Sequence, residues 1–113
     1  MINKYRGVIN IMLLFDYLKS TDIELINTKL KKVAMTNLKH ILNDHYTELE
    51  LNTKQETQTL TFHESLSVIL TGDYNEPVFQ MCLKIYKDEM YLGYYHYLTT
   101  LDLTFVDEFF VIR

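Results

Sequence analysis

The stretch MYLGYYHYL at residues 90–98 decides how this chain folds, because it places four tyrosines and one histidine among apolar residues. Successive side chains of a strand point to opposite faces of the sheet, so the strand register decides which tyrosines are buried. The preceding run VFQMCLKIY at 78–86 is also typical of a strand, and only a short polar segment separates the two runs. The pattern predicts an antiparallel hairpin.

A loop of two residues, Asp88 and Glu89, would place Tyr86 opposite Tyr91. We prefer this register because one face then becomes almost wholly apolar. The inward set is Phe79, Met81, Leu83, Ile85, Leu92, Tyr94, His96 and Leu98. The outward set includes Tyr86, Tyr91, Tyr95 and Tyr97. A loop longer by one residue would exchange the faces of the second strand and turn Tyr91, Tyr95 and Tyr97 inward.

The rest of the chain divides into a helical part, residues 1–45, and a sheet part, residues 46–113. Apolar residues at three- and four-residue spacing predict helices over 3–19 and 21–43, the second capped by Thr21. Alternating patterns predict strands, and the expected segments are 46–52, 59–65, 78–86, 90–98 and 104–112, with a short apolar run at 66–70 and a loop at 71–77. We expect an α+β fold in which two N-terminal helices pack on a mostly antiparallel, curved sheet of four to six strands, with a cone-like sheet as a variant.

The 113 residues are expected to form a single domain, 1–113. The one cysteine, Cys82, has no partner within the chain, which favours a reducing, cytoplasmic compartment. No apolar run is long enough for a membrane span. Asn10 and Asp16 interrupt the N-terminal apolar pattern, so a signal peptide is not expected either.

Charge is divided unevenly between the two parts of the chain. Residues 1–45 carry seven Lys and Arg against four acids, and residues 46–113 carry four against eleven, which gives +3 and −7 and the overall −4. An acidic half disfavours direct contact with a nucleic-acid backbone and favours a basic partner.

No catalytic, metal or cofactor motif is present. The four histidines, His40, His45, His63 and His96, lack the spacing of a metal site, and no glycine-rich phosphate loop occurs. The chain is therefore expected to be a binding protein rather than an enzyme. The alternative is a small cone-shaped enzyme or ligand-binding domain, with His63, His96 and tyrosines lining a pocket.

The segments LGYYHY at 92–97 and VDEFFVI at 106–112, with Asp102 in the turn between them, give a family resemblance over the last quarter of the chain. This order resembles small bacterial immunity proteins of contact-dependent growth inhibition and related toxin systems. The resemblance implies a cytoplasmic protein that binds a cognate toxin domain, often a nuclease, and blocks its active site.

The predicted partner-binding surface combines tyrosines as anchors with acids that engage a basic toxin. Its residues are Tyr86, Tyr91, Tyr95, Tyr97, Asp88, Glu89, Asp102, Asp107 and Glu108. We expect a monomer or weak dimer that needs no cofactor and contacts neither nucleic acid nor membrane. A phage-encoded inhibitor of a nucleic-acid system would show the same acidic surface and stays open as a further alternative.

Overall fold

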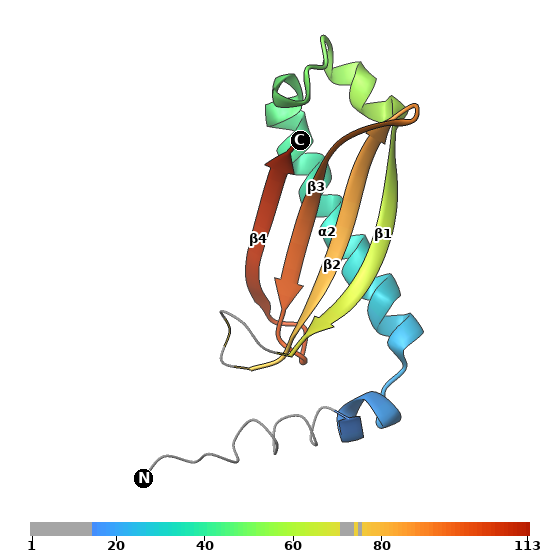
Figure 1. Cartoon of the computed structure of the whole chain (residues 1–113), viewed down its shortest axis with the longest axis vertical. Coiled ribbons are helices and arrows are strands. Elements are labelled where there is room, and N and C mark those ends of the chain that lie inside the picture. Colours follow the sequence, from blue (N-terminus) through green and yellow to red (C-terminus); the bar gives the residue numbers. More distant parts are fainter. Residues whose placement is uncertain (1–14, 71–73, 75) are drawn as a thin grey trace.

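The computed structural model describes residues 15–70, 74 and 76–113, and it confirms an α+β fold. One long helix packs on a four-stranded antiparallel sheet (Figure 1). The elements are α2 (Ile23–His45), the 3₁₀ helices η1 (Tyr46–Leu49) and η2 (Lys54–Thr59), and the strands β1 (Leu60–Ile69), β2 (Val78–Lys87), β3 (Met90–Thr99) and β4 (Phe105–Ile112).

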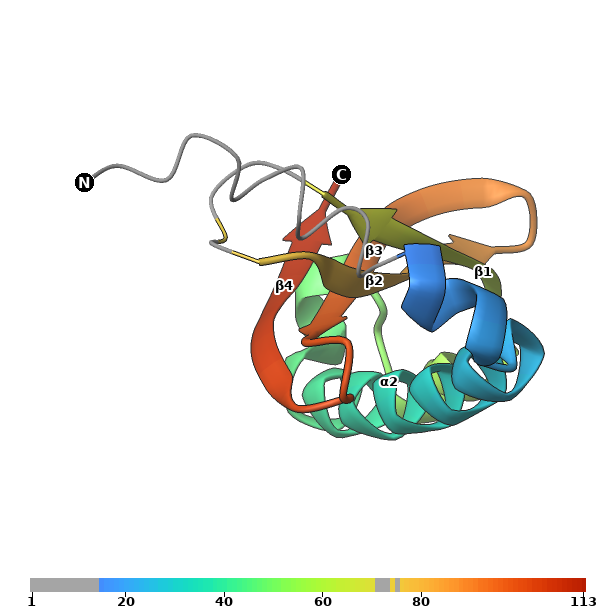
Figure 2. The ribbon, with the colours of Figure 1, turned by 90° about the horizontal axis from the view of Figure 1, so that it is seen from below.

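The strands follow one another in the sheet in chain order, β1-β2-β3-β4, so β1 and β4 are its edges. The sheet curves around α2 and leaves its other face turned away from the helix (Figure 2). We call the face toward α2 the inner face and the opposite face the outer face. The curvature was predicted, and the strand number lies at the lower end of the predicted range.

The helix α2 buries one stripe of side chains against the inner face. Its buried residues are Ile26, Leu30, Ala34, Leu38 and Leu42, at the spacing of one helix face. The predicted cap Thr21 is wrong by one position, because the Asp22 carboxylate accepts from the Leu25 N–H at 3.1 Å. Residues 15–20 are also helical, and the rest of the helix predicted over 3–19 lies outside the described residues.

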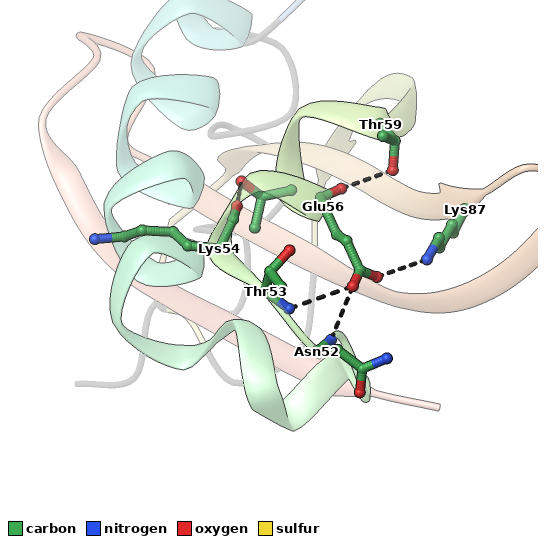
Figure 3. Close-up of polar contacts among 7 residues, drawn as sticks. Asn52, Thr53, Lys54, Glu56, Thr59 and Lys87 are labelled. Carbon is green, nitrogen blue, oxygen red and sulfur yellow. Dashed lines mark hydrogen bonds and ion pairs between the residues drawn. The ribbon is translucent and has the colours of Figure 1, made fainter.

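The strand predicted over 46–52 is wrong, since this segment forms η1 and then turns at Glu50, which has a positive φ of 62°. The next 3₁₀ helix, η2, is preceded by Thr53 as its N-cap residue, and Thr53 and Glu56 form a reciprocal capping box. Glu56 also accepts from the Asn52 N–H at 3.2 Å and from Lys87 Nζ at 2.7 Å (Figure 3). These polar contacts fix a cap over one end of the sheet, where alternation alone had suggested a strand.

The remaining strands agree with the sequence pattern. The predicted segments 59–65 and 66–70 form one continuous strand, β1, with Leu60 and Phe62 packed in the core as expected. The loop predicted over 71–77 lies partly outside the described residues. The two-residue turn of the β2–β3 hairpin is confirmed, because Lys87 pairs with Met90 and Tyr86 with Tyr91. Asp88 takes a φ of 56° in this turn, a conformation that Asp tolerates better than most residues.

Candidate functional site

Beyond Tyr91 the register of β3 shifts by one residue. Tyr86 pairs with Tyr91, but Ile85 pairs with Gly93, so Leu92 is the extra residue of a β-bulge. Gly93 has a φ of 152°, and a Cβ atom there would lie 2.2 Å from the Val111 carbonyl oxygen. Glycine is therefore required at the point where β3 changes register.

The bulge reverses the faces predicted for the second half of β3. Tyr95 is completely buried and Tyr97 is 8% exposed, and both join the core with residues of α2 and β2. Their predicted outward orientation is wrong, as is the inward orientation predicted for Tyr94 and His96. The alternation was read correctly, but a bulge inserts a residue without lengthening the loop.

One of the inward tyrosines, Tyr95, has a hydrogen-bond partner on the inner face. The Tyr95 hydroxyl donates to the Glu108 carboxylate at 2.6 Å, which satisfies a buried donor. Burial, and then the bond to Glu108, raise the pKa of Tyr95 well above its usual range. Burial also raises the pKa of Tyr97, whose ring packs against Phe105 at a centroid distance of 5.4 Å. These groups stabilise the fold and are not free to serve as partner anchors.

The outer face instead gathers five other rings, which we call the outer-face aromatic cluster. Its members are His63, Tyr86, Tyr91, Tyr94 and His96. The ring of His63 lies 4.4 Å from Tyr86, which lies 5.5 Å from Tyr91, and Tyr94 lies 4.4 Å from His96. His63 is exposed and the four others are half-buried. Two of the predicted anchors, Tyr86 and Tyr91, thus lie on this surface.

Lys84 lies between the two groups of rings. It pairs with His63 on one side and with Tyr94 on the other, and its side chain is exposed. Among the described residues no carboxylate forms an ion pair with it. An ammonium group at the centre of the cluster is therefore available to an acceptor on a partner.

Cys82 and His96 are cross-strand neighbours on the outer face, next to the cluster. Burial raises the pKa of the Cys82 thiol and lowers that of the His96 imidazole. Both shifts favour the neutral forms, whereas a nucleophilic Cys–His pair needs a thiolate. The chemistry of this pair suits packing rather than catalysis.

The predicted acids do not form one continuous patch. Asp88 and Glu89 lie in the β2–β3 turn, and Asp102 lies in the turn between β3 and β4 at the opposite end of the sheet (Figure 1). A strand of this length separates the two ends by roughly 30 Å. Asp107 faces outward beside Leu98, at the same end of the sheet as Asp102, and Glu108 faces inward toward Tyr95. The acids thus flank the aromatic cluster instead of mixing with it.

The Asp102 carboxylate is held within its own turn. The Thr100 hydroxyl donates to it, and the bonds from Thr100 and Thr104 lower the pKa of this carboxyl. These bonds favour the ionised form of Asp102.

A cavity of about 500 Å³ opens between α2, η2 and the inner side of β1. Its apolar wall consists of Met35, Leu42, Leu60 and Phe62, and Lys39 lies at its rim. His63 and His96 are on the opposite face of the sheet, so this cavity is not the His-lined pocket of the alternative prediction. Within the described part of the chain no group of three or more His, Cys, Asp and Glu side chains could hold a metal ion.

No helix within the ranges described here is long and apolar enough to cross a membrane. Comparison of the chain with protein-family models, curated proteins and solved structures found no match.

Sequence reasoning did not single out His63 or Lys84 as part of a partner-binding site, and it missed Tyr94 and His96 as outer-face residues. The signal that could have found them is Gly93, since a glycine inside a strand pattern marks a bulge or a close backbone approach.

Proposed function

We propose that this chain is a protein-binding inhibitor that takes its partner on the outer-face aromatic cluster. The cluster is the observation that carries the proposal. Tyrosine offers a large contact area with few rotatable bonds, and aromatic residues are enriched in the centres of protein interfaces. Half-buried rings that already pack against one another lose little further freedom when a partner covers them.

The distribution of charge around the cluster supports the same use. The outer-face aromatic cluster and Lys84 occupy the middle of the outer face, and acids lie toward both ends, Asp88 and Glu89 at one and Asp102 and Asp107 at the other. Protein interfaces have this arrangement, with an aromatic core and a polar rim. The acids would attract a basic partner and speed its association.

Lys84 adds a requirement on the partner. A cation at the centre of a covered surface must meet a carboxylate or a backbone carbonyl, because an unpaired buried charge is costly. The partner that fits is therefore basic around its contact surface and carries an acceptor at its centre. Catalytic sites of nucleases, which combine basic side chains with carboxylates, have this chemistry.

Toxin immunity is the class of inhibitor that we favour. Two observations support this class. The strand half of the chain is rich in acids, and residues 92–97 and 106–112 resemble bacterial immunity proteins in sequence. In this proposal the partner is a toxin domain, most simply a nuclease, and the complex forms in the cytoplasm. The protein itself performs no chemistry.

The test is a growth-protection assay with the polypeptide domain encoded immediately upstream of this chain. Its expression alone should arrest growth, and co-expression of the chain should restore growth. The variant His63→Ala/Tyr94→Ala should lose protection and binding, whereas His40→Ala, which removes an exposed histidine from α2, should retain both. Failure of the wild-type chain to protect contradicts the immunity proposal. Full protection by the double variant contradicts the proposed surface.

Aromatic rings beside a lysine are also the groups that hold the bases of single-stranded nucleic acids, which makes an oligonucleotide the appropriate competing probe. The net charge of −4 opposes such binding, since most of its affinity comes from phosphate contacts. We expect no retention of a fluorescent single-stranded oligonucleotide at moderate salt. Tight binding that falls with His63→Ala/Tyr94→Ala would replace the protein partner with a nucleic acid.

A further inference from the structure

The two edges of the sheet differ in what they expose. The exposed side chains of β1 are all polar: Thr61, His63, Glu64, Ser65 and Ser67. Those of β4 are mostly apolar: Phe105, Phe109, Val111 and Ile112 are between 37% and 52% exposed, and Glu108 is the one exposed polar residue. An exposed apolar edge strand is a template for pairing with another strand, and proteins usually protect such edges with Lys or Pro. β4 contains neither.

The sequence of β4 is complementary to itself when two copies run antiparallel. Directly opposite residues in an antiparallel pair share a face, so a twofold axis perpendicular to the sheet requires paired numbers whose sum is even. An axis at Phe110 satisfies this rule. Phe109 then lies opposite Val111 of the other copy on the outer face.

The same register also pairs opposite charges. Asp107 of each copy lies opposite Arg113 of the other on the outer face, and twofold symmetry makes this contact twice. Asp107 lies near the start of β4 and Arg113 directly follows its last residue, where its N–H continues the pairing with β3 by donating to the Leu92 carbonyl. Only an antiparallel arrangement of two copies therefore brings the two charges together. The third charge, Glu108, is engaged within its own copy by the Tyr95 hydroxyl at 2.6 Å.

We propose that β4 is a dimerisation edge whose partner is a second copy of this chain, paired antiparallel about Phe110. The dimer joins two four-stranded sheets into one continuous sheet. Because the axis is perpendicular to the sheet, both outer faces lie on the same side and both α2 helices lie on the other. The two outer-face aromatic clusters then form one longer surface.

Pairing through a single strand buries a small interface. Interfaces below about 1,200 Å² are those of weak and transient complexes, so we expect a dissociation constant of about 1–100 µM. The full chain should show a sedimentation coefficient that rises with concentration between about 1 and 300 µM, a range that brackets this constant.

Charge reversal distinguishes this register from other ways of associating. Asp107→Lys places like charges opposite each other at Arg113, and Arg113→Glu does the same at Asp107. Each should weaken dimerisation roughly tenfold, since two surface ion pairs become two repulsions. The double variant recreates both pairs and should restore the wild-type constant. Restoration also shows that loss of the local bond from the Glu108 N–H to Asp107 was not the cause.

A second pair of variants tests the apolar part of the edge. Val111→Lys should abolish the concentration dependence, and Ser65→Lys on the exposed surface of β1 should leave it unchanged, with circular dichroism confirming that both remain folded. A wild-type chain that stays monomeric over the whole range overturns the proposal. Dimerisation that Val111→Lys leaves intact, or a double charge reversal that fails to restore it, overturns it as well. None of these measurements depends on whether the chain protects against a toxin.

Discussion

Replacing Gly93 with alanine should lower the free energy of unfolding more than any other change of a single methyl group in β3. A φ of 152° is strained for any residue with a side chain, and such strain costs roughly 1–3 kcal/mol. The added Cβ would also lie 2.2 Å from the Val111 carbonyl oxygen and 3.1 Å from the Ile112 Cα. Backbone atoms of β4 cannot rotate away, so the β3–β4 pairing must open locally. Together these effects should lower the free energy of unfolding by about 3–5 kcal/mol.

Urea and thermal unfolding followed by circular dichroism measure this loss. For a chain of this size the midpoint temperature should fall by about 10–20 °C. The matched control is Ser65→Ala, a change at an exposed position of β1, which should alter stability by less than about 0.5 kcal/mol. A loss below about 1 kcal/mol for Gly93→Ala would refute the bulge as the device that fixes the register of β3.

Three further outcomes follow from the buried and half-buried groups. Tyr95→Phe should cost about 1–2 kcal/mol by removing the bond to Glu108. Because the folded-state pKa of Tyr95 is raised, the wild type should also lose stability as pH rises above 10, more than this variant does. The pKa of His96 is lowered in the folded state, so the unfolded chain binds more protons and stability should fall as pH drops below about 6.5. Urea titrations at several pH values should show that His96→Gln reduces this loss of stability. Cys82, which is 8% exposed and whose pKa is raised, should react with iodoacetamide far more slowly in the native protein than in urea, as mass spectrometry of the labelled chain would report.

The β2–β3 hairpin shows how far sequence patterns reach. Alternation placed the strands, and the apolar consistency of one face selected the two-residue turn that the structure contains. The bulge at Leu92 could not be derived from alternation, since its cause is the approach of β4 to Gly93, a contact made by a strand that comes later in the chain. A register derived from β2 and β3 alone was therefore wrong beyond Tyr91, where β3 also contacts β4.

The strand predicted over 46–52 was wrong for a different reason. Its alternating leucines and glutamates fit a strand, but both Leu49 and Leu51 are buried from a 3₁₀ turn and the chain that follows it. The bond from Lys87 to Glu56, 31 residues apart, anchors this cap and has no local sequence signal. In α2 the period of the helix was predicted, but the structure buries Ala34 completely and leaves Val33 42% exposed.

The sequence predicted the type of surface that forms the candidate site, but not all of its residues. A tyrosine-rich sheet face does exist, and Tyr86 and Tyr91 belong to it. Tyr94 and His96 take the places predicted for Tyr95 and Tyr97, because one inserted residue reverses a strand of period two. The acids were expected beside the tyrosines, but Asp88, Glu89 and Asp102 lie in turns at the ends of the sheet, and Glu108 faces inward from β4.

Hydroxyl-radical footprinting of the free protein and of its complex with the upstream-encoded domain tests the central claim directly, because it reports both which tyrosines face outward and which of them the partner covers. We predict that Tyr86, Tyr91 and Tyr94 are oxidised in the free protein and protected in the complex, while Tyr95 is unmodified in both. Oxidation of Tyr95 at the rate of Tyr94 in the free protein, or equal oxidation of Tyr94 with and without the partner, would contradict the account.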